Sequence, residues 1–153
     1  MAYLGLVLII GVPSNCLVLS KLLTQYKAAS KDSVKAGFLL LKLNLTISDL
    51  MLIFIIAGGK LTWLYTYEWK GGDFLCKAYN FLSMAAFYKS SNIVICIALD
   101  RLRTARSVRL MVHFSWVLAV LCSLPQLIVW SAVNVFPQIE EGWYQCTDIW
   151  QIN

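Results

Sequence analysis

The chain has 153 residues, of which 59% are hydrophobic and only 14% are charged, and its mean hydropathy is +0.69. These values exclude an ordinary soluble domain, in which roughly 45–50% of residues are apolar and about 25% are charged. The net charge of +5 comes from short basic clusters between apolar runs. Anionic membrane lipid accounts for such clusters, so we expect a lipid bilayer and no nucleic acid as a partner.

Four long apolar runs divide the chain, at residues 1–20, 43–59, 78–99 and 110–139. Because about 20 helical residues cross a hydrocarbon layer roughly 30 Å thick, each run predicts one spanning helix. The first run has no preceding positive charge, which favours a retained helix over a cleaved signal. We predict an all-α membrane protein with four transmembrane helices and a final loop. The helices are expected over residues of about 2–24, 34–65, 74–104 and 108–134, and the loop over 135–153.

Basic residues are distributed unequally between the two ends of these helices. Nine lie around the first and third turns, namely Lys21, Lys27, Lys31, Lys35, Lys42, Arg101, Arg103, Arg106 and Arg109. By the positive-inside rule, this side is predicted to be cytoplasmic. We therefore expect a multi-pass protein of the plasma membrane, with its amino terminus and its tail on the extracellular side.

Two of the five cysteines, Cys76 and Cys146, are the only ones in segments predicted to face outward. Because the outside is oxidising, this topology predicts a disulfide between the third helix and the tail. A bridge that closes such a loop stabilises a fold by about 4 kcal/mol in the loop-entropy description. The alternative is that both cysteines are unpaired.

Charged residues within the predicted spans are the main candidates for function. An ionised Asp49 in the second span costs at least a few kcal/mol without partners, so it is either functional or a protonated acid that holds helices together. Ser90 in the third span becomes informative if it lies opposite Asp49. Lys89 projects about 100 degrees away from Ser90 around its helix. It pairs with a carboxylate such as Asp49, faces a helix outside this chain, or marks an imperfection in the sequence.

No catalytic constellation is recognisable. The sequence contains no Cys/His cluster with metal spacing, no nucleophile elbow and no glycine-rich phosphate loop. We therefore predict no catalytic residues and do not expect an enzyme.

Several motifs occur in the order, spacing and predicted topology of a known family. They are Asn15, Asn44-Leu45-x-x-x-Asp49, Trp69-x-x-Gly72-Asp73-x-x-Cys76, Asp100-Arg101 and Trp116. Together they resemble the first four helices of a rhodopsin-like (class A) G-protein-coupled receptor. Further segments look most like the gonadotropin-releasing hormone and adipokinetic hormone receptor group. These are Trp63-x-x-Thr66-x-x-Trp69, Leu75-Cys76-Lys77, Leu124-Pro125-Gln126 and Gln145-Cys146-Thr147.

The resemblance implies an extracellular amidated neuropeptide or peptide hormone as ligand, and a heterotrimeric G protein as intracellular partner, most often one that couples to phospholipase C. It places Lys60, Trp63 and Ser83 in the upper ligand pocket. Some relatives have an acid where Lys60 stands and a base where Ser83 stands, which leaves the identity of the ligand open.

The resemblance also assigns roles inside the membrane. Asn15, Asp49 and Ser90 match an intramembrane polar network, with sodium at Asp49 and Ser90 as the only candidate cofactor. A nearby Lys89 could instead replace the cation electrostatically. Asp100 and Arg101 resemble the ionic lock that releases the arginine toward the G protein on activation.

Two departures from the family bear on activity. Only 15 positions separate Arg101 from Trp116, about a dozen fewer than in relatives, and the chain stops at Asn153 before any fifth helix. We therefore expect a partial receptor domain over residues 1–153 that does not signal by itself. The alternative is a receptor-derived four-helix protein that acts by association with other membrane proteins. A small transporter or channel that uses Asp49 and Lys89 is a third, less favoured hypothesis.

Overall fold

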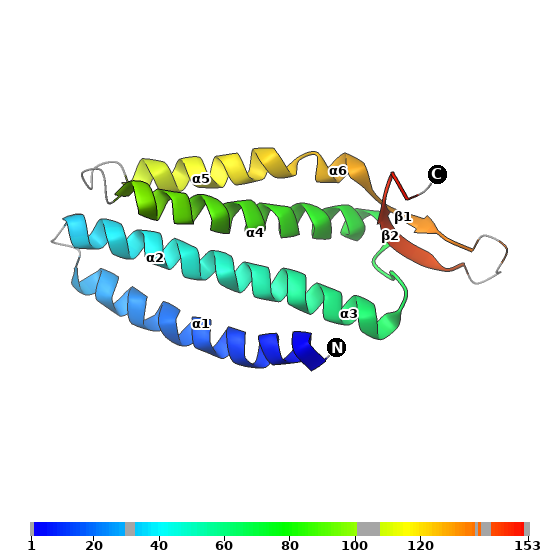
Figure 1. The fold of residues 1–153 in the computed structure, drawn as a ribbon, viewed down its shortest axis with the longest axis horizontal. Coiled ribbons are helices and arrows are strands. Elements are labelled where there is room, and N and C mark those ends of the chain that lie inside the picture. The colour runs from blue at the N-terminus through cyan, green and yellow to red at the C-terminus, as the bar shows by residue number, and fades with distance from the viewer. Residues whose placement is uncertain (1, 30–32, 101–107, 137, 139–141, 152–153) are drawn as a thin grey trace.

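The computed structural model describes residues 2–29, 33–100, 108–136, 138 and 142–151. Four long helical segments lie roughly side by side in chain order, and a two-stranded hairpin follows the last of them (Figure 1). The helical elements are α1 (Ala2–Ala28), α2 (Ser33–Leu52), η1 (Ile53–Gly58), α3 (Gly59–Thr66), α4 (Gly72–Asp100), α5 (Val108–Ser123) and α6 (Gln126–Val129). The strands are β1 (Trp130–Asn134) and β2 (Tyr144–Asp148).

Within the described residues, four helical segments are long and apolar enough to cross a membrane. They are Ala2–Ala28, Val34–Thr66, Gly72–Asp100 and Val108–Val129. Many large apolar side chains on these helices stay exposed, such as Ile9 at 72% and Leu110 at 70%, as expected where lipid replaces water. The prediction of a membrane protein with four transmembrane helices is confirmed, and the chain is a multi-pass membrane protein.

The second spanning helix contains a π-helical turn, η1, between α2 and α3. The backbone N–H of Gly59 reaches the carbonyl oxygens of both Ile55 and Ile56 at the end of this turn. A π-helical turn accommodates an extra residue, so it rotates the side chains that follow around the helix axis. It therefore contributes to the direction in which α3 presents Lys60 and Trp63. Nothing in the sequence indicated this turn.

The first and fourth helices end at residues that differ from the prediction. α1 continues to Ala28 instead of residue 24, since lysine side chains at a membrane boundary can extend their charged ends toward water. The fourth segment ends at Val129 instead of residue 134, because Trp130 adopts an extended backbone and starts β1. Residues 101–104, predicted to end the third helix, lie outside the described part of the chain.

The tail, predicted as a loop, forms an antiparallel β-hairpin in which Trp130 pairs with Asp148 and Asn134 with Tyr144. In the middle of this ladder, Ala132 pairs with Cys146. The hairpin lies beside the start of α4 and the end of α3 (Figure 1). We call this end of the molecule, which also contains the start of α1, the hairpin end.

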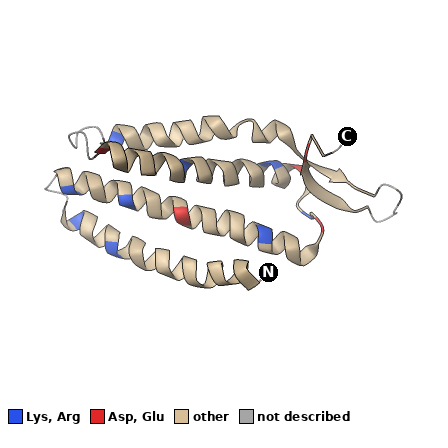
Figure 2. Cartoon of the chain, viewed as in Figure 1, with Lys and Arg blue, Asp and Glu red and all other residues tan. Residues whose placement is uncertain are grey.

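The opposite end of the helices contains the described basic residues of the predicted cytoplasmic clusters. Lys27 lies in the last turn of α1, Lys35 near the start of α2 and Arg109 near the start of α5. Figure 2 shows basic residues in all three helices at this end, which we call the basic end. A buried apolar cluster packs α2, α4 and α5 together near it, and consists of Leu41, Ile93, Cys96, Val108 and Val112.

Candidate functional site

Two adjoining cavities open at the hairpin end. The first, with a volume of about 440 Å³, is lined by Ile56, Lys60, Trp63, Tyr79, Asn80, Ser83, Met84, Phe87 and Trp130, and we call it the upper pocket. The second, of about 510 Å³, is lined by Lys60, Trp63, Leu64, Tyr67 and Gln145. The structure thus brings Lys60, Trp63 and Ser83 together on one cavity, which is lined by residues of η1, α3 and α4 and by Trp130 of β1.

Hydrogen bonds fix the position of Trp63 in this pocket. Its indole Nε1 donates to Gln145 Oε1 at 2.9 Å, and Gln145 Nε2 donates to the carbonyl oxygen of Tyr67 at 2.8 Å. A backbone bond of 2.8 Å from Trp69 N to Tyr144 O adds a second link between β2 and the segment after α3. The pocket wall and the hairpin are therefore one connected structure.

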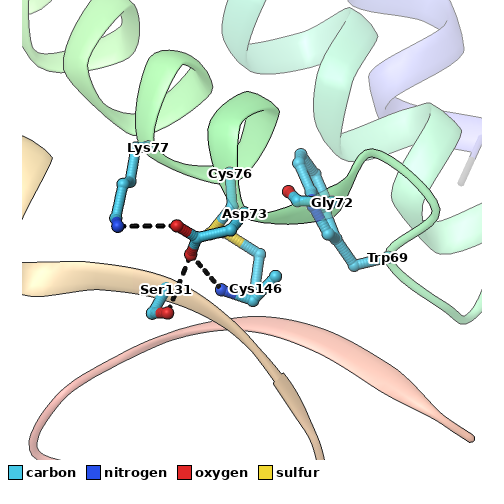
Figure 3. Close-up of polar contacts among 8 residues, drawn as sticks. Trp69, Gly72, Asp73, Cys76, Lys77, Ser131 and Cys146 are labelled. Atoms are coloured by element: carbon cyan, nitrogen blue, oxygen red, sulfur yellow. Dashed lines mark hydrogen bonds and ion pairs between the residues drawn. A yellow bond between two sulfur atoms is a disulfide. The ribbon is translucent and has the colours of Figure 1, made fainter.

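The hairpin is also attached to the first turns of α4 through both strands (Figure 3). β2 is attached by the disulfide between Cys76 and Cys146, whose Cα atoms are 5.6 Å apart. β1 is attached by Asp73, whose Oδ1 accepts hydrogen bonds from Ser131 Oγ at 2.8 Å and from Ala132 N at 3.1 Å. The other carboxylate oxygen of Asp73 accepts a bond of 2.6 Å from Lys77 Nζ.

Sequence reasoning did not identify the roles of Asp73 and Gln145 in holding the hairpin. The four-residue step from Asp73 to Lys77 on a helix could have indicated their ion pair. The contacts of Asp73 with β1 had no sequence signal, because they join positions 58 and 59 residues apart.

In the membrane-spanning part, Asp49 and Ser90 meet as the resemblance implies. Ser90 Oγ of α4 donates a hydrogen bond of 3.2 Å to Asp49 Oδ1 of α2. Asn15 makes a different contact, because its Nδ2 donates to the carbonyl oxygen of Gly11 in its own helix at 2.9 Å. Two of the three residues of the expected network are therefore joined directly, and they offer a carboxylate and a hydroxyl from separate helices.

The environment of Lys89 matches neither of the two structural alternatives, a carboxylate partner or a helix outside this chain. Its side chain is fully buried, its Nζ donates to Ser115 Oγ at 3.2 Å, and it lies 4.6 Å from the centre of the Trp116 ring. Lys89 makes no ion pair with any residue that the structure describes. Pairing of Lys89 with Asp49, or with a helix outside the chain, is therefore wrong. The reason is geometric, since α4 directs Ser90 toward α2 and Lys89 toward α5.

Trp116 connects this contact to a third helix. Its Nε1 donates a hydrogen bond of 3.2 Å to Asn44 Oδ1, and Asn92 Nδ2 donates to the backbone oxygen of Ser115 at 3.4 Å. Polar contacts between α2, α4 and α5 thus surround the lysine.

At the end of α4, Asp100 is described, but Arg101 lies outside the described residues, so the ionic lock stays a prediction.

Comparison with known proteins gives the family. The sequence pattern of the 7 transmembrane receptor (rhodopsin family) matches residues 14–153. The chain belongs to this family, and the resemblance seen in its motifs is confirmed.

Similar proteins include several named receptors. The G-protein coupled receptor daf-38 of Caenorhabditis elegans is 35% identical over 94% of this chain and 35% of its own length. The gonadotropin-releasing hormone receptor of Octopus vulgaris is 29% identical over 97% of this chain and 38% of its own. The cephalotocin receptor 1 of the same octopus is 32% identical over 84% of this chain and 34% of its own. The chain thus spans about a third of the length of these relatives.

Proposed function

We propose that this chain forms the first four helices of a receptor for an extracellular peptide, and that the peptide binds in the upper pocket. The observation that carries this proposal is a cavity that joins Lys60, Trp63 and Ser83 under a hairpin fixed by a disulfide. The aromatic walls of the cavity suit apolar and aromatic side chains of a peptide. Two relatives bear the names of receptors for gonadotropin-releasing hormone and cephalotocin, which supports a peptide hormone or neuropeptide as ligand.

The orientation that we propose has the hairpin end outside the cell and the basic end in the cytoplasm. This orientation puts the disulfide in an oxidising compartment and the basic side chains next to anionic lipid. The amino terminus is then extracellular, since α1 starts at the hairpin end. The heterotrimeric G protein meets the basic end. There Asp100 restrains Arg101, and activation releases the arginine toward the G protein.

We also propose that Asp49 and Ser90 hold a sodium ion. An ionised carboxylate within a spanning helix requires a compensating charge, and Lys89 does not supply it by direct contact because it bonds to Ser115. The carboxylate of Asp49 and the hydroxyl of Ser90 are hard oxygen donors, which are the kind that a small hard cation prefers. The ion would stabilise the packing of α2 on α4 by neutralising the acid.

Association with other membrane proteins is a second candidate function. On the side of α4 that holds Ser90, Phe87 and Val94 are both 55% exposed, next to the half-buried Asp49. Such a face can accept further helices, because polar groups and close packing drive helix association in lipid. Those helices would belong either to the rest of the receptor or to another protein.

The decisive experiment is to recover the complete coding sequence that contains residues 1–153 and to express its product in cells. G-protein activation is then recorded with a panel of amidated peptides that includes gonadotropin-releasing hormone and cephalotocin. We expect at least one peptide to activate in a dose-dependent manner, with Trp63→Ala raising the required concentration. A surface-expressed product with seven spans that responds to no peptide would contradict the proposal. A product that ends at Asn153 and is recovered with other membrane proteins would favour association instead.

A further inference from the structure

The upper pocket contains two polar side chains without partners. Lys60 is exposed, and its ammonium makes no hydrogen bond or ion pair with any residue in the described part of the chain. Ser83 Oγ is buried and has no hydrogen-bond partner. Both residues line the same cavity, Lys60 from α3 and Ser83 from α4.

The nitrogen donors of the cavity other than Lys60 are already engaged, including Trp130 Nε1, which donates to Gln126 Oε1 at 2.7 Å. Trp63 Nε1 donates to Gln145, and Asn80 Nδ2 contacts the carbonyl oxygen of Cys76 at 2.9 Å and Cys146 Sγ at 3.3 Å. No carboxylate is among the residues that line the upper pocket or the adjoining cavity, whereas Glu68 lines a further cavity that shares Trp63 and Tyr79 with the upper pocket. What the described site offers to a ligand is therefore one positive charge, from Lys60, and the hydroxyls of Ser83, Tyr79 and Tyr67, set among aromatic rings.

A buried polar group without a partner costs free energy, and a charge covered by an uncharged ligand costs more. A ligand that covers Lys60 without supplying negative charge would remove water from the ammonium and give nothing in return. A carboxylate accepts hydrogen bonds from both an ammonium and a hydroxyl, and bonds that involve a charged group are the stronger ones.

We infer that the upper pocket selects a ligand with a carboxylate, which lies between the Lys60 ammonium and the Ser83 hydroxyl. This inference rests on the peptide-receptor function proposed above and specifies the chemistry of the ligand. The carboxylate comes from an acidic side chain of the peptide, with aromatic or apolar neighbours that contact Trp63 and Phe87. The carboxylate at a free peptide end has the same chemistry and is separated from an acidic side chain by the experiment.

The test uses the full chain in neutral lipid nanodiscs and four pools of random decapeptides. Three pools are amidated and carry Glu, Gln or Lys at one fixed central position, and the fourth carries Gln there and has a free carboxyl end. Retention of each pool is measured by mass spectrometry against empty nanodiscs. We expect the Glu pool to be retained about tenfold better than the amidated Gln pool, as expected for a charge pair at a site that is partly open to water. Higher retention of the free-acid pool than of the Glu pool would overturn the assignment to a side chain.

Variants distinguish the effect of the Lys60 charge from that of the overall positive charge of the protein. Lys60→Met keeps a long apolar side chain and should abolish the preference for Glu, Lys60→Glu should reverse it toward Lys, and Ser83→Ala should reduce it. Lys70→Met is the matched control, because Lys70 is an exposed lysine at the same end that does not line the upper pocket. An equal loss of preference in Lys70→Met would show attraction by the overall positive charge and overturn the inference.

The experiment distinguishes failure of this inference from failure of the proposed function. Retention of all amidated pools to the same extent, above empty nanodiscs, would overturn selection for a carboxylate and leave peptide binding intact. Retention of no pool would count against peptide binding by this chain, and thus against both.

Discussion

Lys89 of α4 and Ser115 of α5 are joined by a hydrogen bond of 3.2 Å in a region where both side chains are buried. The ring of Trp116 lies next to the same ammonium, with its centre 4.6 Å away. The lysine is therefore held by neutral groups only, among the residues that the structure describes. A hydroxyl and an aromatic face are both favourable partners for a cation, although neither neutralises it.

This arrangement predicts opposite effects for the two sides of the bond. Lys89→Met removes the charge and keeps most of the volume, so stability should stay the same or increase, because apolar replacement of a buried charge is often neutral or favourable. Ser115→Ala should destabilise by about 1–3 kcal/mol, because it leaves the ammonium without its hydroxyl partner. The double variant should recover most of that loss. Thermal unfolding in detergent measures all three, and a Lys89→Met variant less stable than Ser115→Ala would contradict this account.

The disulfide predicts a specific count of reactive thiols. Cys16, Cys96 and Cys122 are free, and Cys76 is joined to Cys146. Alkylation of the denatured, unreduced protein should therefore modify three cysteines, and alkylation after reduction should modify all five. Mass spectrometry of the peptides identifies which ones change. Modification of Cys76 and Cys146 before reduction would show that the link is absent and would remove the reason for placing the hairpin end outside.

We expect the hydrogen bonds of Asp73 to hold β1 on α4 in addition to the disulfide. In Asp73→Asn the residue loses its charge, so its bonds to Ser131, Ala132 and Lys77 weaken together. The backbone amide of Ala132 should then exchange hydrogen several-fold faster. Lys77→Met is the control, since it removes the exposed ion pair and leaves the two bonds to β1, and exposed pairs contribute little. Hydrogen exchange followed by mass spectrometry measures both, and equal exchange in both variants would argue against this role of the carboxylate.

Asp49 predicts a specific stabilisation by sodium. If Asp49 and Ser90 hold the ion, raising sodium at constant ionic strength, with N-methylglucamine as the replaced cation, should raise the melting temperature. Asp49→Asn should abolish the effect, since the neutral amide no longer attracts the cation. Glu68→Gln is the matched control, because it removes a carboxylate in the loop after α3 and should leave the effect unchanged. Equal melting temperatures with and without sodium in the unaltered chain would exclude the site.

The four spans followed from the sequence because apolar runs of sufficient length have few other stable structures. Asp49 and Ser90 meet as the resemblance implied, and the pairing of Cys76 with Cys146 agrees with a topology in which only these two face outward. The sequence left the role of Lys89 open between a carboxylate partner, an absent helix and an imperfection in the sequence. The structure places it instead against a serine and a tryptophan of α5.

Other features of the structure depend on contacts that a linear pattern does not contain. The end of the fourth helix at Val129 depends on the pairing of β1 with β2, and that pairing depends on the anchors at Asp73 and Cys76. Likewise, η1 lies in an apolar run without proline, where the sequence reads as regular helix. The direction of Lys60 and Trp63 therefore needed the structure.

Adjacent glycines at the junction of η1 and α3 give the last prediction. A Cβ atom on Gly59 would clash with Cε2 of Tyr79, whereas a Cβ atom on Gly58 would meet nothing within 4 Å. Gly59→Ala must therefore displace the Tyr79 ring, which packs against Trp69 at a centroid distance of 5.9 Å and lines the upper pocket. We expect a loss of about 1–3 kcal/mol, typical of overpacking. Gly58→Ala should be neutral or stabilise by up to about 1 kcal/mol, because alanine loses less conformational entropy in a helix. Thermal unfolding compares the two, and tryptophan fluorescence reports whether Trp69 has moved. Equal stability of the two variants would show that the Tyr79 ring does not pack against Gly59.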